Sequence, residues 1–295
     1  MATETLSGAH PADPLVNPGR VGGLVDVFRR RYLLKLLVRK ELRVRYQGSA
    51  VGLAWSYVKP LVRFLMYYFV LGQLLPKDLE HRGLHIFSGM IMVSFFTDAL
   101  SAGTKSVVRN KALVRKINLP REMFPVASML VSAYHMVPMY VIALGGVLFA
   151  GWHPNAASVS AGLLALAIVW VWGLGTALLL SAWNVYFRDV SNLVDVIQTI
   201  VTWTVPMIYP FSAINVVLSG WVEQAYLASP LCIAVLLNDR ALWIPALDHP
   251  QAAIPVELPP YLFQRGLVAL AVGLLFLTLA QIVFSRLEGR FAEKL

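Results

Sequence analysis

Long apolar stretches alternate along this chain with short stretches that hold most of its charged residues. Of the 295 residues, 58% are hydrophobic and 14% are charged, whereas about a quarter of the residues of an average soluble protein are charged. Several apolar stretches reach the ~20 residues that a helix needs to cross a bilayer. The pattern predicts an all-α, polytopic membrane protein and disfavours a soluble protein with one very large core.

Six membrane spans are predicted. Their approximate ranges are 60–76, 84–103, 123–150, 158–184, 194–217 and 262–284. The fifth span contains Pro206 and Pro210. A proline inside a helix removes a backbone hydrogen bond and bends the helix. We therefore expect a break in this span, and we expect the freed carbonyl groups to find another partner.

Lysine and arginine fall on alternate connections between the spans. Nine lie between residues 20 and 45 and six in the 104–122 connection, whereas 151–157 has none and 218–261 has only Arg240. Basic flanks of membrane helices stay in the cytoplasm. Both termini and the 104–122 connection are therefore predicted to be cytoplasmic, in a plasma-membrane protein. This arrangement explains the net charge of +9 without nucleic acid as a partner.

The same features divide the chain into segments. Residues 1–20 are predicted to be a disordered cytosolic tail, 21–50 an amphipathic interface helix, 51–285 a six-span membrane domain and 286–295 a cytosolic tail. The external segment 218–261 contains apolar stretches that are too short to span a bilayer. Two short re-entrant helices are the preferred interpretation of this segment, and a compact external cap is the alternative.

The predicted interface helix has a basic side and an apolar side. At 100° per residue the two sides are formed by Lys35, Arg39 and Arg43 and by Leu33, Leu37 and Val44. Such a helix is suited to lie in the cytosolic interface, where acidic headgroups hold it. A signal that only sets the topology is the alternative.

Lys59 and Arg63 flank the start of the first span. One turn inside the interface, both side chains can extend to water at little cost. Simple anchoring of the helix is one interpretation of this pair. A cationic doorway for an anionic lipid headgroup is the other.

The cytosolic connection 106–125 combines basic residues with apolar ones, which predicts a helix of one or two turns that docks on a cytosolic partner. Asn110 is expected to cap this helix by accepting backbone N–H bonds, and Pro120 is expected to end it. The residues predicted to take part are Asn110, Leu113, Val114, Lys116, Ile117 and Leu119.

The tight turn between the fourth and fifth spans holds Arg188 and Asp189, and Asp195 follows one or two turns into the next helix. Carboxylates inside a membrane are functional candidates. An Arg188–Asp195 pair that closes the helix hairpin explains these residues adequately and is the preferred interpretation.

Aromatic residues are dense in and near the first and fifth spans. The set that we expect to line a path for sugars comprises Tyr67, Tyr68, Trp203 and Tyr209. Aromatic faces pack on the C–H faces of sugars, but each of these residues singly also fits the aromatic belts at a membrane surface.

Several kinds of chemistry lack their sequence signals. The chain has no G-x-x-x-x-G-K-S/T motif, so it is predicted to bind no nucleotide through a P-loop. It has one cysteine, Cys232, and no histidine cluster or acidic cluster that would indicate a metal site or a glycosyltransferase. His135 lies within a span, where an interhelical hydrogen bond is the common role of such a residue. We therefore expect neither an enzyme nor a cofactor bound by this chain.

Four strings, in this order and topology, resemble the permease subunits of type-2 ABC exporters for polysaccharides, the O-antigen, teichoic acid and capsule group. They are LVRKELRVRYQGSAVGLAWSYVKP (37–60), NKALVRKINLPREMFP (110–125), FRDVSNLVDVIQTIVTWTVPMIY (187–209) and ASPLCIAVLLNDR (228–240). In the last string Ser229 stands where the family more often has asparagine.

The resemblance implies a homodimer above two copies of a separate ABC ATPase subunit, which would hold ATP and Mg. It implies a polyprenyl-diphosphate-linked glycan as cargo, residues 110–119 as the coupling helix and residues 218–240 as external gate helices. The Ala-, Val- and Arg-rich composition resembles that of actinobacterial proteins, for which a cell-wall galactan exporter is the specific interpretation. Lys59 and Arg63 would then receive the diphosphate at the cytosolic leaflet.

Three alternatives remain open at this point. A permease for a drug or a small lipid in the same family is the nearest. An ion-coupled secondary carrier would need carboxylates within its spans, and Asp98 is its only weak candidate. A membrane-embedded enzyme of lipid-glycan assembly would need the acidic cluster that the sequence lacks.

Overall fold

The computed structural model describes residues 23–70, 80–116 and 119–295. In these ranges all regular structure is helical, which confirms the all-α prediction. The predicted tail 1–20, the end of the first predicted span and Ile117 lie outside the described residues.

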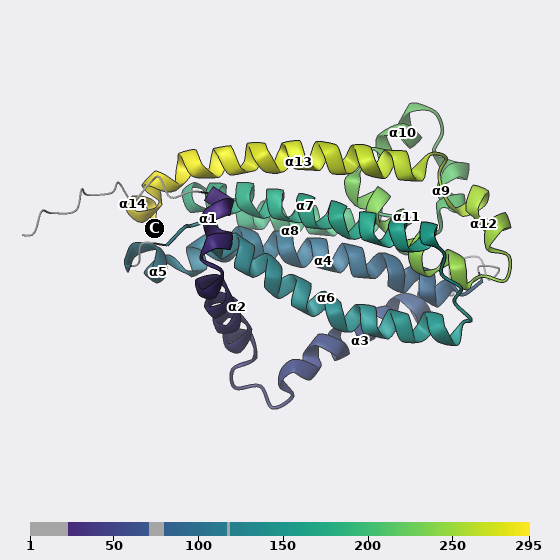
Figure 1. Cartoon of the computed structure of the whole chain (residues 1–295), viewed down its shortest axis with the longest axis horizontal. Helices are drawn as coiled ribbons and strands as arrows, with labels where there is room; N and C mark the ends of the chain where they lie inside the picture. Colours follow the sequence, from purple (N-terminus) through teal and green to yellow (C-terminus); the bar gives the residue numbers. More distant parts are fainter. Residues whose placement is uncertain (1–22, 71–79, 117–118) are drawn as a thin grey trace, which may run out of the picture.

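Four helices are long and apolar enough to cross a membrane, and they run side by side (Figure 1). They are α4 (Arg82–Arg109), α6 (Met123–Phe149), α7 (Ala156–Tyr186) and α13 (Leu262–Leu287). They correspond to the predicted spans 84–103, 123–150, 158–184 and 262–284. The chain is therefore a multi-pass membrane protein.

A fifth candidate span is formed by two helices that meet at a sharp bend. α10 (Trp221–Leu227) and α11 (Pro230–Leu242, continued by a 3-10 turn at Ile244–Ala246) are inclined by 76° to each other, as in a broken span or a re-entrant loop. α11 packs on α4, α7 and α13. Two re-entrant helices in this segment stay a prediction.

Within the described residues, the helices at the other two predicted spans do not reach the length that a bilayer requires. α3 (Trp55–Val70) has 16 described residues, and α8 (Val190–Thr204) has 15. α8 ends before Pro206, and α9 (Phe211–Val217) begins after Pro210. The expected proline break is therefore present. A count of six spans stays a prediction.

The freed carbonyl groups at the end of α8 have a partner within the chain. The Tyr209 hydroxyl lies 3.1 Å from the Trp203 carbonyl oxygen and 2.8 Å from that of Thr204, and it donates to both. This is the replacement that a proline break in a membrane helix needs.

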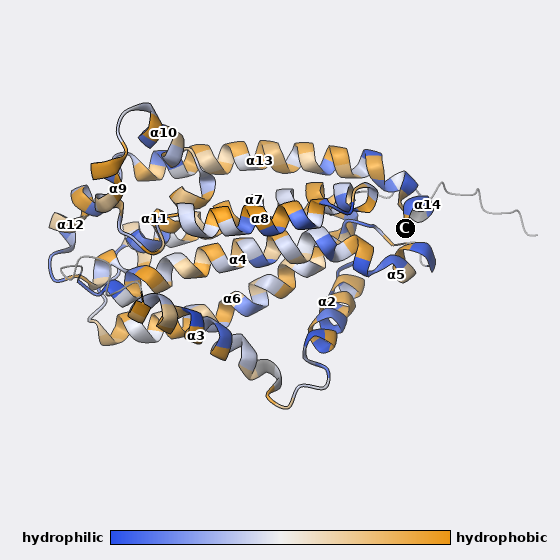
Figure 2. Cartoon of the chain, turned by 180° about the vertical axis from the view of Figure 1, so that it is seen from behind, coloured by the Kyte–Doolittle hydropathy of each residue, from blue (hydrophilic) through white to orange (hydrophobic). Residues whose placement is uncertain are grey.

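The short helices gather at the two ends of the bundle (Figure 1). One end carries α1 (Gly23–Arg29), α5 (Lys111–Lys116) and α14 (Phe291–Lys294), with the hydrophilic residues seen in Figure 2. The opposite end carries α9, α10 and α12 (Pro250–Glu257).

The predicted interface helix is divided at Arg30 into α1 and α2 (Arg31–Tyr46), and α2 lies across the direction of the long helices (Figure 1). Leu37 is buried, as the predicted apolar side requires, whereas Val44 is 59% exposed. Val44 lies on the wall of an open cavity between α2, α4 and α6 and is not packed in the core.

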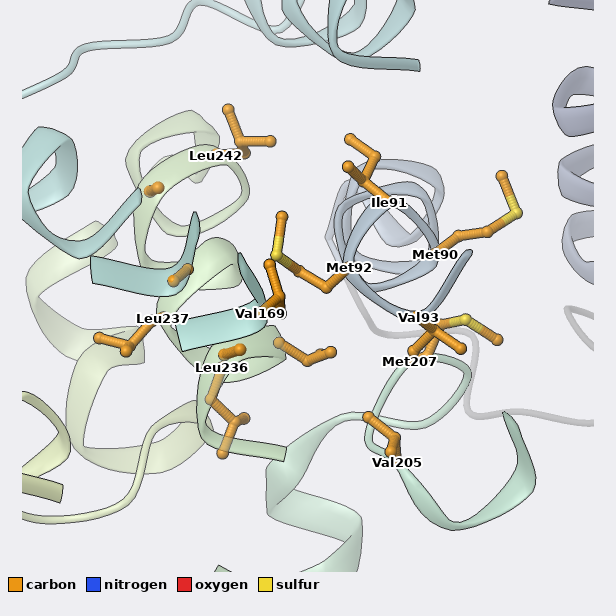
Figure 3. Packing of buried hydrophobic residues seen from close by; sticks show 14 of the residues in the cluster. Met90, Ile91, Met92, Val93, Val169, Val205, Met207, Leu236, Leu237 and Leu242 are labelled. Carbon is orange, nitrogen blue, oxygen red and sulfur yellow. The ribbon is translucent and has the colours of Figure 1, made fainter. Parts of the chain in front are cut away.

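The main core joins α4, α7, α11 and the turn after α8. Figure 3 shows Met92 of α4, Val169 of α7, Leu236 of α11 and Met207 of this turn packed together, and all four are buried. A small residue lets α4 and α7 approach closely, because a Cβ atom on Gly103 would lie only 2.5 Å from the Cβ of Ala177. Small residues at such crossings are typical of membrane helix packing.

Candidate functional site

A cavity of about 300 Å³ lies where the end of α2 and the start of α3 meet the middle of α4 and α6. Its polar lining comes from four helices and the connection between α2 and α3. These residues are Arg45, Tyr46, Ser49, Ser56, Lys59, Arg63, Ser94, Asp98, Ser132 and His135. We call this space the cationic cavity, because three cationic side chains and one carboxylate line it.

Both predicted doorway residues, Lys59 and Arg63, lie on the wall of the cationic cavity and are exposed. The Arg63 Nη1 atom donates to the Ser94 hydroxyl at 3.3 Å. The Lys59 ammonium lies 5.9 Å from the ring centroid of Trp55, within the range of a cation–π contact. With Arg45 they leave the lining positive overall, which suits an anionic ligand.

Three side chains in the cavity wall, each from a different helix, are joined by hydrogen bonds. His135 Nδ1 lies 3.0 Å from the Ser56 hydroxyl and 3.2 Å from the Tyr46 hydroxyl, and the two hydroxyls are 2.5 Å apart. The expected interhelical hydrogen bond of His135 is therefore confirmed. It fixes α2 and α3 on α6 and so keeps the cavity wall in place.

A second cavity, of about 440 Å³, lies between α2, α4 and α6 toward the end that carries α5. Arg45 and Asp98 line both cavities. The other charged residues of the second cavity are Lys40, Glu41, Lys105 and Arg109. Two spaces with a cationic excess thus adjoin at one arginine and one carboxylate.

The predicted coupling segment forms a short helix, α5, directly after α4. The expected capping by Asn110 is wrong. Its backbone carbonyl accepts from the N–H groups of Leu113 and Val114, but its side-chain oxygen accepts from the Lys40 ammonium at 2.6 Å. The Asn110 amide donates to Glu41 at 3.0 Å. The Asn110 amide also donates to the Ser106 carbonyl of α4 at 3.0 Å. The buried side chain is therefore held by α2 and α4, and its oxygen is not available to cap α5.

The remaining coupling residues face different surroundings. Val114 is buried in the core at this end of the bundle, Leu113 and Leu119 are half-buried, and Lys116 is exposed together with Arg115. Val114 thus holds α5 on the chain itself, and the basic side of α5 faces outward. The docking role of these residues stays a prediction.

The predicted Arg188–Asp195 pair is also wrong. Asp195 pairs with Lys105 of α4, with 3.6 Å between Nζ and Oδ1, while Arg188 and Asp189 are exposed in the turn before α8. The reason is the packing of α8 on α4, which brings Asp195 to a lysine far from it in sequence.

The four residues of the predicted glycan path lie on α3 and around the end of α8. Tyr68 lines a groove near the C-terminal end of α3 with Phe64 and Phe69, and Tyr67 packs against the main core. Trp203 is 56% exposed, whereas the Tyr209 hydroxyl is engaged by α8. A common path over these residues stays a prediction.

Comparisons with known proteins identify the kind of chain that carries this cavity. Residues 32–235 match the family of ABC-2 type transporters, and this range contains the whole cationic cavity. Two proteins of Klebsiella pneumoniae called O-antigen export system permease protein RfbA are 22% and 23% identical over 273 residues, which cover 88% of this chain and 94% of each relative. A protein of the same name from Myxococcus xanthus is 24% identical over 194 residues, 64% of this chain and 73% of that relative. The family match covers well over half of the sequence, so this chain belongs to the ABC-2 type transporters.

Proposed function

We propose that this chain is the transmembrane subunit of an ABC exporter that moves a polyprenyl-diphosphate-linked polysaccharide out across the plasma membrane. The observation that carries the proposal is the cationic cavity with Arg45, Lys59 and Arg63 on its walls. A diphosphate cannot cross hydrocarbon without great desolvation cost. The cationic side chains of α2 and α3 offer it a place to leave the lipid surface.

The cavity is of a size for a headgroup and not for a polymer, since small-molecule sites usually measure about 300–1,000 Å³. We infer that Lys59 and Arg63 receive the diphosphate, while the sugar chain passes between two copies of this chain. Aromatic residues such as Tyr67, Tyr68 and Trp203 would contact the sugars weakly and repeatedly, as conduction requires. The relatives named for O-antigen export support a polysaccharide as cargo.

The topology that fits this function has six spans and cytoplasmic termini. The basic end with α1, α5 and α14 would face the cytoplasm, and the segment 218–261 would form the outer gate. Residues 1–20 and 286–295 would be cytosolic tails around the interface segment 21–50 and the membrane domain 51–285.

The energy for export would come from a separate ABC ATPase, present in two copies, which binds ATP and Mg itself. Its closure would push on residues 110–119, and that movement would open the interface of the homodimer. Cell-wall galactan is the specific cargo that we propose, and a drug or small lipid is the alternative.

The test is reversal of one charge in the cavity. Arg63→Glu should lower export of the lipid-linked glycan at least about tenfold, because an anionic headgroup then meets a like charge. Export is measured as glycan outside cells in which the variant is the only copy, and lipid-linked glycan should accumulate inside them. The amount of protein in the membrane and its copurification with the ATPase should stay unchanged.

Arg286→Glu is the matched control, because Arg286 is an exposed arginine near the end of α13. It should export normally. Normal export by Arg63→Glu would contradict the doorway. If depletion of the wild-type protein causes no lipid-linked glycan to accumulate, the polysaccharide cargo itself is wrong and a drug or small lipid replaces it.

A further inference from the structure

Asp98 occupies an unusual position in the cationic cavity. It lies in α4, within a candidate membrane span, and it is half-buried. It lines both the cationic cavity and the adjoining second cavity, at the place where Arg45 does the same. Arg45 and Asp98 are thus the charged residues that the two cavities share.

Three cations line the cationic cavity together with Asp98: Arg45, Arg63 and Lys59. Within the part of the chain that the structure describes, however, Asp98 forms no direct ion pair, since the pairs closer than 4.0 Å involve other carboxylates. The carboxylate is therefore shared among the three cations and is not committed to one of them. An anion that enters the cavity therefore meets the same three cations and the negative charge of Asp98.

Three uncompensated cations around a partly enclosed cavity in a bilayer repel one another and are costly to desolvate. One carboxylate among them reduces this cost while the cavity is empty. The same carboxylate becomes a like-charged neighbour once a diphosphate has entered. It then weakens the binding of that diphosphate, and a transport site must bind weakly enough to release its cargo.

We propose that Asp98 is the resident counter-ion of the cationic cavity: it balances Arg45, Lys59 and Arg63 when the cavity is empty and limits the affinity for an anionic headgroup so that the headgroup can leave. This inference rests on the proposed function, because it assumes that the cavity receives a diphosphate. It assigns Asp98 a role in release, which differs from proton coupling and from a purely structural ion pair.

The experiment compares Asp98→Asn with wild type in the intact transporter, the chain together with its ATPase, held in lipid nanodiscs. The probe is a fluorescent short-chain polyprenyl diphosphate. Asp98→Asn should lower its Kd about tenfold, because one like charge is removed from a poorly screened site. Export of glycan in cells should fall several-fold, because release slows. Asp98→Glu should restore both values.

A purely structural role for Asp98 predicts a different result, namely less assembled transporter with an unchanged Kd. That outcome overturns the inference. Asp189→Asn serves as the matched control, since Asp189 is an exposed carboxylate in the turn before α8, and it should change neither Kd nor export.

Asp98→Asn alone could leave the cavity too positive to assemble, and a second pair of variants covers that case. Lys59→Gln is compared with the double variant Lys59→Gln/Asp98→Asn, whose formal cavity charge equals that of wild type. The double variant should bind the probe about tenfold more tightly than Lys59→Gln. Equal affinities of the two variants overturn the inference.

Arg63→Gln separates failure of this inference from failure of the proposed function. If the cavity receives no diphosphate, both Arg63→Gln and Asp98→Asn leave the Kd of the probe unchanged. If Arg63→Gln raises the Kd and Asp98→Asn leaves it unchanged, the doorway stands and the counter-ion role alone is overturned.

Discussion

The ammonium group of Lys40 in α2 donates a 2.6 Å hydrogen bond to the side chain of Asn110, the residue that joins α4 to α5. Glu41 adds two contacts at the same place, because it accepts from the Asn110 amide and pairs with Arg109. Further along α2, Arg45 and Tyr46 line the cationic cavity. One helix, α2, thus connects the proposed coupling segment to the wall of the cavity. A displacement of α5 would therefore move α2, and with it Arg45 and Tyr46 in the wall where the headgroup is proposed to bind.

Removal of Glu41 should therefore weaken the link between ATP hydrolysis and export. In Glu41→Ala, Arg109 and Asn110 both lose a partner on α2. The bond from the buried Asn110 amide to the charged Glu41 contributes about 1.5–3 kcal/mol, and the exposed Arg109–Glu41 pair contributes less, about 0–1 kcal/mol. We expect glycan export to fall about tenfold while ATP hydrolysis by the complex changes less than twofold. The measurement is the number of ATP molecules hydrolysed per lipid-linked glycan exported, in reconstituted vesicles.

Lys35→Ala provides the control for this prediction, because Lys35 is an exposed residue of the same helix. It should leave the ratio of hydrolysis to export as in wild type. An unchanged ratio in Glu41→Ala would show that α2 does not transmit the movement of α5.

The outward basic side of α5 should determine ATPase docking. Arg115 and Lys116 are exposed, whereas Val114 is buried in the chain itself. Charge reversal in Arg115→Glu/Lys116→Glu should weaken copurification of the ATPase about tenfold, since like charges across an interface are costly. The transporter itself should keep its thermal stability.

Val114→Ala should give the opposite pattern, with a lower thermal midpoint and normal ATPase binding, because it creates a cavity in the core and leaves the outer side intact. Copurification is measured by pull-down through a tag on this chain. ATPase binding that is lost in Val114→Ala but kept in the double charge reversal would contradict this prediction. It would mean that Val114, and not Arg115 and Lys116, lies on the side of α5 that binds the ATPase.

The sequence predicted those features that depend on neighbouring residues. The four long helices follow from their apolar length, the break after Thr204 follows from Pro206 and Pro210, and α5 follows from a short apolar set between basic residues. Each of these is decided within some twenty residues of chain. Local patterns of this kind are what a single sequence reports best.

The features that sequence reasoning missed depend on contacts between distant segments. Asn110 was expected to bond within its own helix and bonds to α2, and Asp195 was expected to pair with Arg188 and pairs with Lys105. The buried pair of His85 and Asp239, 3.2 Å apart, has no local signal at all. Polar side chains inside a membrane protein form hydrogen bonds and ion pairs with residues of other helices. Their partners therefore depend on the tertiary fold and not on the neighbouring sequence.

The close approach of α4 and α7 makes Gly103 sensitive to one methyl group. In Gly103→Ala the new Cβ would lie 2.5 Å from the Cβ of Ala177 and 3.1 Å from its Cα, so the helices must separate. Overpacking of this kind costs about 1–3 kcal/mol. We expect a thermal midpoint several degrees lower in detergent, measured by tryptophan fluorescence.

Gly145→Ala is the matched control, because Gly145 lies in α6 and a Cβ there meets no atom within 4 Å. It should be neutral or slightly stabilising, since alanine favours a helix by up to about 1 kcal/mol over glycine. The double variant Gly103→Ala/Ala177→Gly should recover part of the loss. A full loss in the double variant would assign the effect to something other than this contact.

Glu122, directly before α6, should give the protein a measurable pH dependence of stability. It is buried; Oε1 accepts from the Gln281 amide at 2.8 Å, whereas Oε2 has no hydrogen-bond partner among the residues described. Burial raises the pKa of this carboxyl above its ordinary value of 4.5. The folded state then binds more protons than the unfolded state between 4.5 and the raised pKa, so the free energy of unfolding falls as pH rises through that interval.

In Glu122→Gln this contribution to the pH dependence should be absent, because glutamine does not titrate and can still accept from Gln281. The thermal midpoint of wild type should decrease from pH 4.5 upward relative to that of the variant, and the difference should become constant above the raised pKa. Glu293→Gln, a change at an exposed carboxylate of α14, should follow wild type throughout. Parallel curves for wild type and Glu122→Gln over this interval would mean that the carboxyl of Glu122 has the same pKa in the folded and unfolded states.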